Sequence, residues 1–194
     1  MADQKISAMP NAATLTGTEL VPLVQGGANV KTTLSTLRAF DNAYGAFSDN
    51  TDQTGNISAG TPVTMNTVDV ADGVTVASGS RITVPAAGVF YLQFSIQFKN
   101  TGNTQDDATV WLRINGVDLA NSATQYTIPA RKSAGIFGYN VSSLTFMLVL
   151  NASDYVEIVW APTSTSVTIE ALPASTTPAF PAIPSVVATM MQVA

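Results

Sequence analysis

Residues 88–98 read Gly88-Val89-Phe90-Tyr91-Leu92-Gln93-Phe94-Ser95-Ile96-Gln97-Phe98, with an apolar side chain at every even-numbered position from 90 to 98. The odd-numbered positions from 91 to 97 carry tyrosine, glutamine or serine. Because successive side chains of a strand point to opposite faces, this alternation produces one apolar and one polar face. Positions two apart lie about 200° apart on a helix, so no helix could separate these residues. The segment therefore predicts a long, half-buried antiparallel strand in an all-β domain.

Shorter apolar stretches follow one another between residues 41 and 194. The other strand candidates are 43–47, 62–65, 73–76, 81–84, 109–115, 117–119, 125–128, 141–150, 155–160, 166–172 and 185–193. Asn115-Gly116 predicts a type I′ hairpin, since both residue types tolerate positive φ. Prolines recur between residues 173 and 184, and they predict an extended loop because proline cannot donate to a ladder. Many short strands with such turns predict an antiparallel jelly-roll sandwich.

The composition of the chain favours assembly over catalysis. Hydrophobic residues make up 46% of the 194 residues and charged residues only 11%, against roughly 25% charged in soluble domains. So few charges on a hydrophobic chain favour burial of surface between subunits. The net charge of −5 and the lack of cationic clusters beyond Arg131-Lys132 argue against a nucleic-acid partner.

The sequence contains no cysteine and no histidine, so disulfides, thiolate chemistry and the commonest general base and metal ligand are absent. We expect no catalytic residues, no metal ion and no cofactor. Two carboxylate pairs are candidates for acid–base or calcium sites: Asp49 with Asp52, and Asp106 with Asp107. Both lie in polar stretches, and the favoured interpretation is solvated turn residues. Trp111 is expected at an interface or in the core, with stacking on a sugar as the alternative.

Two strands have apolar residues on both faces. In 144–150 the even positions are apolar, and so are Met147 and Val149; in 155–160 Tyr155 and Val159 lie on the face opposite Val156, Ile158 and Trp160. Such strands need cover on both sides. We expect Met147, Val149, Tyr155 and Val159 to form an oligomer interface. The alternative is cover by the loop 173–184 or by the N-terminal segment.

Residues 1–40 differ from the rest and are expected to form an attachment arm, whereas 41–194 form the head domain. Residues 18–24 predict a strand, 25–29 a turn and 30–32 a return strand. Thr32 or Thr33 is then an N-cap candidate for a short helix. The apolar residues expected to carry attachment are Leu20, Val21, Leu23, Val24, Leu34, Leu37 and Phe40. A disordered tail is the alternative. The polar start and the lack of a long apolar run predict a protein made in a cytoplasm, without a membrane partner.

Three segments together resemble the trimeric jelly-roll family of complement and tumour-necrosis-factor domains. They are 73–92 (GVTVASGSRITVPAAGVFYL), 112–116 (LRING) and 150–156 (LNASDYV). The resemblance covers about residues 45–193. Ser153 stands where the family has glycine, which affects the expected geometry of that turn. The resemblance implies a homotrimer, and it transfers no catalytic residues.

Residues 6–27 (ISAMPNAATLTGTELVPLVQGG) are similar to the leader of many bacteriophage tail fibres and head appendages, where it serves attachment or trimer formation. The two resemblances imply a bacteriophage virion protein, made in the bacterial cytoplasm, whose partners are itself and the capsid, portal or tail. It would act as a capsid decoration (cement) protein or as a short head or tail fibre. One alternative is a receptor-binding module for host surface polysaccharide that uses Trp111, Tyr126 or Tyr139. Another is a depolymerase that uses the carboxylate pairs.

Overall fold

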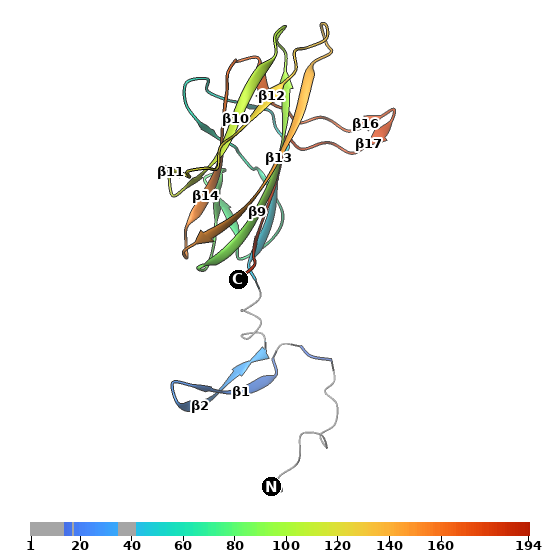
Figure 1. Cartoon of the computed structure of the whole chain (residues 1–194). Helices are drawn as coiled ribbons and strands as arrows, with labels where there is room; N and C mark the ends of the chain where they lie inside the picture. Colours follow the sequence, from blue (N-terminus) through green and yellow to red (C-terminus); the bar gives the residue numbers. More distant parts are fainter. Residues whose placement is uncertain (1–13, 17, 35–41) are drawn as a thin grey trace. The chain divides into compact units, whose positions relative to one another are not determined.

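The computed structural model describes residues 14–16, 18–34 and 42–194 (Figure 1). The chain divides into two compact units, Met1–Asn42 and Ala43–Ala194. The second unit is built almost entirely from β-strands, as the alternation in residues 88–98 predicts. Among the described residues, Leu34 alone has helical backbone. The remainder of the predicted N-terminal helix, with Leu37 and Phe40, lies outside the described part of the chain.

The first unit contains the hairpin that the sequence predicts. Strand β1 (Leu20–Gln25) pairs antiparallel with β2 (Ala28–Thr33). Gly26 and Gly27 connect them with φ values of 59° and 80°, the left-handed conformation that a two-residue hairpin turn requires.

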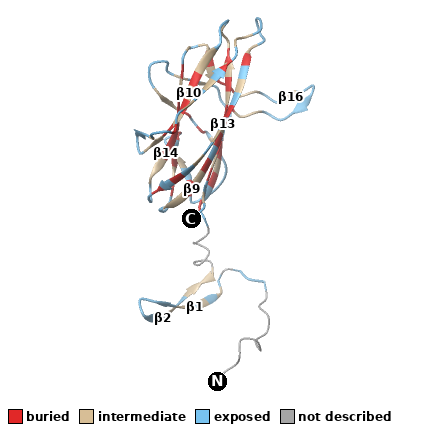
Figure 2. Ribbon diagram, viewed as in Figure 1, coloured by how far each residue is buried: buried red, intermediate tan, exposed pale blue. Residues whose placement is uncertain are grey.

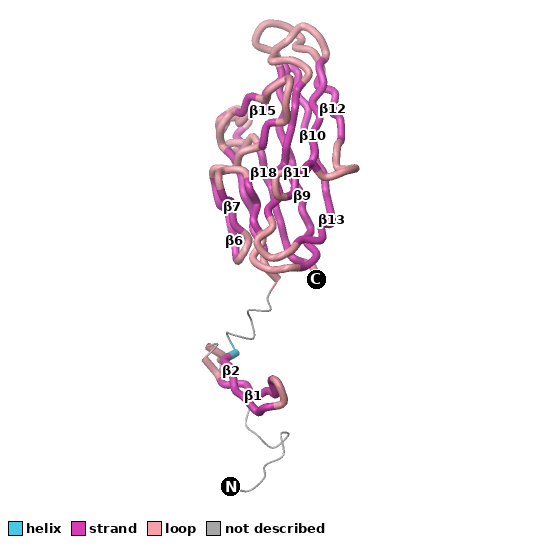
Figure 3. The backbone as a smooth tube through the Cα atoms, turned by 90° about the vertical axis from the view of Figure 1, so that its left-hand side faces the viewer, coloured by secondary structure: helices cyan, strands magenta, loops and turns pink. Residues whose placement is uncertain are grey.

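The second unit is a sandwich of two sheets (Figure 3). The strands of the first sheet are β5 (Thr61–Pro62), β7 (Thr75–Ala77), β8 (Arg81–Thr83), β10 (Asp106–Ile114), β11 (Val117–Asp118), β12 (Thr124–Ile128) and β14 (Tyr155–Pro162). The strands of the second sheet are β3 (Tyr44–Asp49), β4 (Gln53–Thr54), β6 (Thr67–Asp72), β9 (Gly88–Asn100), β13 (Gly138–Leu150), β15 (Val167–Ile169) and β18 (Val186–Gln192). Every ladder in both sheets is antiparallel.

The strand pairing is nested along the chain. β3 pairs with β18, β8 with β14, β9 with β13, and β10 with β12. The first of these strands pairs with the last, and each later strand of the first half pairs with a progressively earlier strand of the second half. An antiparallel ribbon that winds into a jelly roll produces this nested pairing. The predicted fold class is therefore confirmed.

The core lies between the two sheets and contains the apolar face of β9 (Figure 2). Phe90, Leu92, Phe94, Ile96 and Phe98 are all buried, whereas the side chains between them are half-buried or exposed. Burying an aromatic or aliphatic side chain of this size contributes about 1.5–3 kcal/mol. This confirms the prediction that the even-numbered residues of β9 face the core and the odd-numbered ones face outward.

The turn at Asn115-Gly116 also has the predicted geometry, with φ values of 50° and 83° between β10 and β11. Three features differ from the expectation. The strands β4 and β6 were not predicted: β4 has only two residues, and in β6 the alternating Val68 and Val70 are 62% and 52% exposed. The loop expected at 173–184 contains a small hairpin, in which β16 (Ser175–Thr176) pairs with β17 (Ala179–Phe180). Strands of two residues produce no periodicity that a sequence could reveal.

Candidate functional site: an uncharged sheet face

The outer surface of the second sheet has a broad uncharged area. We call this area the neutral face and define it by the outward residues of β3, β9, β13 and β18 other than Ser48, Lys99 and Tyr139, which lie at its border. These are Tyr44, Ala46, Val89, Tyr91, Gln93, Ser95, Gln97, Val141, Ser143, Thr145, Met147, Val149, Val187, Thr189 and Met191. Their neighbours along each strand point into the core. The face therefore follows from the period of two in each strand.

One row across this face is apolar over four strands. Met147 lies opposite Tyr91, Tyr91 opposite Met191, and Met191 opposite Tyr44. Met147 is 60% exposed and Met191 42% exposed. Beside this row, Val149 is 84% exposed. Large exposed apolar side chains that adjoin one another mark an interaction surface more often than an ordinary protein surface.

A hollow interrupts the centre of the neutral face. It has a volume of about 240 Å³ and is lined by Gln93, Phe94, Ser95, Ser143, Val187 and Thr189. Ser143 lies directly opposite Ser95, and Val187 lies on the other side of Ser95. The hollow exists because two short serine side chains face each other between longer neighbours.

Charged groups lie at the border of this face. On β6, Asp72 is the strand partner of Tyr44, and Asp69 accepts a hydrogen bond from Ser48 Oγ at 3.2 Å. At another edge the charge is paired. Lys99 forms an ion pair with Glu170, and its ammonium group lies 4.3 Å from the centre of the Phe137 ring. Beside this pair, partial burial and then the Glu170 carboxylate raise the pKa of Tyr139. The charge of Lys99 is thus neutralised within the chain, and it leaves the neutral face without a cation of its own at this end.

The predicted interface residues separate into two groups. Met147 and Val149 are exposed on the neutral face, and their role as an interface stays a prediction. Val159 is 0% exposed, so its assignment to an interface is wrong. A Cβ atom at Gly60 would collide with Trp111 and Val159, which shows that the segment before β5 covers Val159. The cover of Val159 thus comes from within the second unit.

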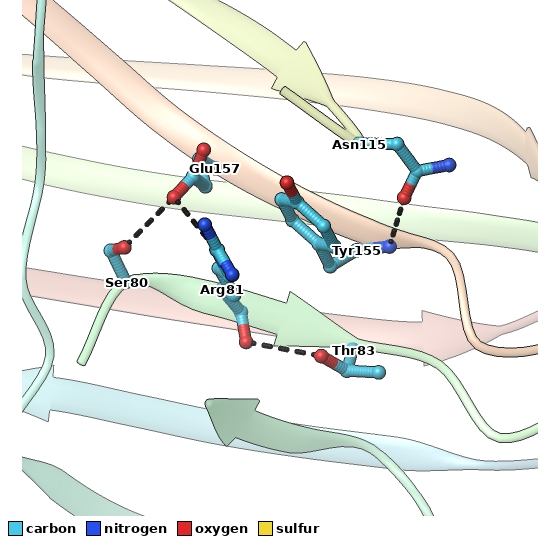
Figure 4. A network of polar contacts seen from close by, with 6 residues as sticks. All are labelled: Ser80, Arg81, Thr83, Asn115, Tyr155 and Glu157. Carbon is cyan, nitrogen blue, oxygen red and sulfur yellow. Dashed lines mark hydrogen bonds and ion pairs between the residues drawn. The ribbon is translucent and has the colours of Figure 1, made fainter. Parts of the chain in front are cut away.

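Tyr155, the fourth predicted interface residue, belongs to a polar cluster on the outer surface of the first sheet (Figure 4). The Arg81 guanidinium lies 4.6 Å from the centre of the Tyr155 ring. Glu157 accepts hydrogen bonds from Ser80 Oγ at 3.0 Å and from Arg81 Nε at 3.5 Å. Tyr155 N donates to Asn115 Oδ1 at 3.0 Å. These contacts hold β8 and the β10–β11 turn to β14, so the cluster has a structural role.

The carboxylates weighed as catalytic pairs are occupied by structural hydrogen bonds. Asp49 is 1% exposed and accepts bonds from Thr51, Thr64 and Asn66. Its expected place in a solvated turn is therefore wrong. Asp52 lies in the loop between β3 and β4 and accepts a bond from Ala171 N at 2.9 Å.

The second carboxylate pair lies in β10 rather than in a turn. Asp107 accepts bonds from Gln125 and Thr127, and Asp106 accepts one from Asn100. Adjacent residues of a strand point to opposite faces, so Asp106 and Asp107 do not face a common substrate position.

The aromatic residues weighed for sugar binding differ in exposure. Trp111 is half-buried under the Gly60 segment, and its Nε1 donates to Asp118 Oδ1 at 2.9 Å. This bond, assisted by Arg113, holds the pKa of Asp118 below its usual value. Tyr126 is also half-buried, and its hydroxyl donates to Ser143 O at 3.4 Å. Tyr139 is 47% exposed.

The expected attachment residues lie on alternating sides of the N-terminal hairpin. Leu20 and Val24 are exposed, whereas Val21, Leu23 and Leu34 are half-buried. Leu34 N donates to Glu19 O at 2.8 Å, which extends the pairing beyond the strands. The described part of the N-terminal unit therefore presents the large apolar side chains of Leu15, Leu20 and Val24 to solvent.

Sequence reasoning identified only part of the neutral face. It missed Tyr44, Val187 and Met191, although the lack of charge at outward positions of residues 89–97 was a usable signal. Among residues 14–16, 18–34 and 42–194, no three acidic side chains converge as a metal site would require. The same residues contain no apolar helix of the length needed to cross a membrane. No protein-family model matches the chain, and no curated protein matches it in sequence.

Proposed function

We propose that this chain is a non-enzymatic structural protein of a bacteriophage virion. It assembles as a homotrimer through the neutral face and attaches to the particle through its N-terminal unit. Its role is that of a capsid decoration (cement) protein or of a short head or tail fibre. The observation that carries this proposal is the row Met147, Tyr91, Met191 and Tyr44, which is apolar and open to solvent in a single chain.

The chemistry of the neutral face supports self-association. Its core is rich in methionine, tyrosine and valine, and charged residues are kept to its border. Depletion of charge with enrichment of methionine and tyrosine is typical of the buried centre of protein interfaces. Because the face carries no charge, it contacts a neighbouring copy in the trimer without electrostatic repulsion.

The number of copies rests on the resemblance to the complement and tumour-necrosis-factor family, whose jelly rolls associate as trimers. The bacteriophage assignment rests on residues 6–27, which are similar to the leader of phage fibres and head appendages. Separation of Met1–Asn42 from the sandwich as its own unit suits an attachment role. The exposed Leu20 and Val24 are available there for contact with a capsid, portal or tail protein.

The test of assembly is the mass of the full chain in solution, measured by light scattering. We expect a trimer of chains of 20.2 kDa each. Met147→Glu places a charge in the apolar row and should dissociate the trimer. Val117→Glu is the matched control, because Val117 is 71% exposed on β11 of the other sheet and should leave the trimer intact. A monomeric wild-type chain would refute the proposed assembly.

Attachment and role are tested on particles. A chain that lacks residues 1–42 should fold and associate but should not join the virion. Quantitative mass spectrometry of purified virions then distinguishes the roles, since a cement protein is present in many copies and a fibre in few. Absence of the full-length chain from purified particles would contradict the virion assignment.

A further inference from the structure

We propose that the β16–β17 hairpin of one copy docks into the hollow of the neutral face of a neighbouring copy. This inference rests on the proposed assembly and names the contact that directs it. The docked hairpin places Phe180 over the hollow of the neighbouring copy, which is bordered by Ser95, Ser143 and Val187.

The β16–β17 hairpin is a regular, hydrogen-bonded element, and most of its residues are exposed to solvent in the single chain. Its base is closed by two hydrogen bonds of 2.9 Å between Leu172 and Ile183, one in each direction. Further out, Ser175 pairs with Phe180 and Thr176 with Ala179. Figure 1 shows the hairpin extending away from the sheet that contains β10 and β14.

The composition of the hairpin suits burial against a neutral surface. Residues 173–184 contain no charged side chain. The residues from Thr176 to Ala182 are all exposed, and they include Phe180, which is 39% exposed. A two-residue ladder with an exposed aromatic ring gains little stability by itself, because an isolated hairpin is at best marginally stable in water. Contact with another surface therefore explains why this segment is uncharged and carries an exposed aromatic ring.

The volume of the hollow and its lining side chains suit the Phe180 ring and the short strands of the hairpin. Its volume of about 240 Å³ exceeds the roughly 150 Å³ of a cavity that accommodates benzene, so a phenyl ring fits. Val187 supplies an apolar wall for the ring. The hydroxyl groups of Ser95, Ser143 and Thr189 supply donors and acceptors for the backbone edge of short strands.

The position of the hairpin in the chain favours exchange between copies. The hairpin leads directly into β18, and Val187 of β18 lines the hollow. Each copy therefore carries a projecting hairpin whose C-terminal end continues into a strand that lines the hollow. When each copy inserts its hairpin into the next, every copy makes the same contacts, and a rotation that closes produces a ring.

Cysteine cross-linking tests the contact directly, since the natural chain has no cysteine to interfere. Full-length chains with Phe180→Cys and full-length chains with Ser143→Cys are co-expressed and mildly oxidised. We expect a disulfide that joins positions 180 and 143 of different chains, identified by peptide mapping. The matched control pairs Phe180→Cys with Val117→Cys, which is exposed on the other sheet and should not cross-link.

A second variant separates this inference from the proposed assembly. Phe180→Ala should weaken association by about tenfold or more, as removal of a buried aromatic anchor does. Ile57→Ala, at an exposed apolar residue of another loop, should not. A trimer that forms without the 180–143 cross-link and tolerates Phe180→Ala overturns the hairpin contact and leaves the assembly standing. A chain that carries both Phe180→Cys and Ser143→Cys and cross-links only within itself also overturns the hairpin contact. A monomeric wild type overturns both proposals.

Discussion

The ring of Phe98 on β9 lies 5.7 Å from the ring of Trp160 on β14, centroid to centroid, and is tilted by 49°. The two residues belong to different sheets, so their contact joins the halves of the sandwich across the core. Both are 0% exposed. Tilted aromatic pairs at this separation add about 0.5–1.5 kcal/mol to the free energy gained by burial alone.

Phe98→Ala should therefore lower the free energy of unfolding by about 3–5 kcal/mol, because it removes a buried ring and leaves a cavity. The measurement is urea unfolding followed by tryptophan fluorescence, to which Trp111 and Trp160 both contribute. Gln97→Ala is the control, since the neighbouring residue points outward and should change stability little. An equal effect of the two substitutions would contradict the assignment of faces along β9.

Gly60→Ala should destabilise the sandwich by about 1–3 kcal/mol, because a methyl group there collides with Trp111 and Val159. The emission of Trp111 should also shift, since its cover moves. Ser58→Ala, at an exposed position of the same segment, is the control for loss of a surface side chain. Unchanged stability in Gly60→Ala would mean that this segment does not close over Val159.

Ser153→Gly should raise the free energy of unfolding by about 1 kcal/mol. Ser153 has a φ of 68°, and the left-handed conformation costs a residue with a side chain roughly 1–2 kcal/mol. Part of that gain is lost because glycine is more flexible in the unfolded chain. Ala152→Gly, one position earlier, should instead reduce stability. If both substitutions destabilise the protein equally, the strain at position 153 is absent.

The contribution of Asp118 to the free energy of unfolding should be lost in acid. The hydrogen bond from Trp111, with help from Arg113, lowers the pKa of Asp118 in the folded state below the usual 3.8. A lowered folded pKa contributes stability above the unfolded value, and this contribution is lost as the pH falls through the folded value. Asp118→Asn should therefore be less stable than the wild type at pH 6. The difference, measured by urea unfolding, should shrink as the pH falls below 3.8, and a difference that does not depend on pH would contradict this origin.

Local pattern was sufficient for the elements that depend on neighbouring residues alone. The alternation in 88–98 predicted β9 and its buried face, and Asn115-Gly116 predicted the turn between β10 and β11. Glycine at positions 26 and 27 similarly marked the N-terminal hairpin. In each case the side-chain period or the φ requirement acts over a few residues, so no long-range contact is needed to specify it.

Contacts between distant segments could not be predicted in this way. The apolar residues Met147 and Val159 look alike in sequence, yet the first is exposed and the second is covered by the segment around Gly60. The buried state of Asp49 depends on Thr64 and Asn66, which lie 15 and 17 residues away. Burial is a property of what packs against a side chain, and the residue itself does not reveal its cover.

The sequence alone thus established the longer strands that carry an apolar face and the tight turns, because these follow from periodicity and backbone sterics. Only the tertiary structure showed which outward surfaces stay open. It placed Tyr91 beside Met147 and Met191 in one row, and it left the hairpin that contains Phe180 without cover. Strand pairing sets these juxtapositions, and residues far apart in the chain become neighbours only when the jelly roll is wound.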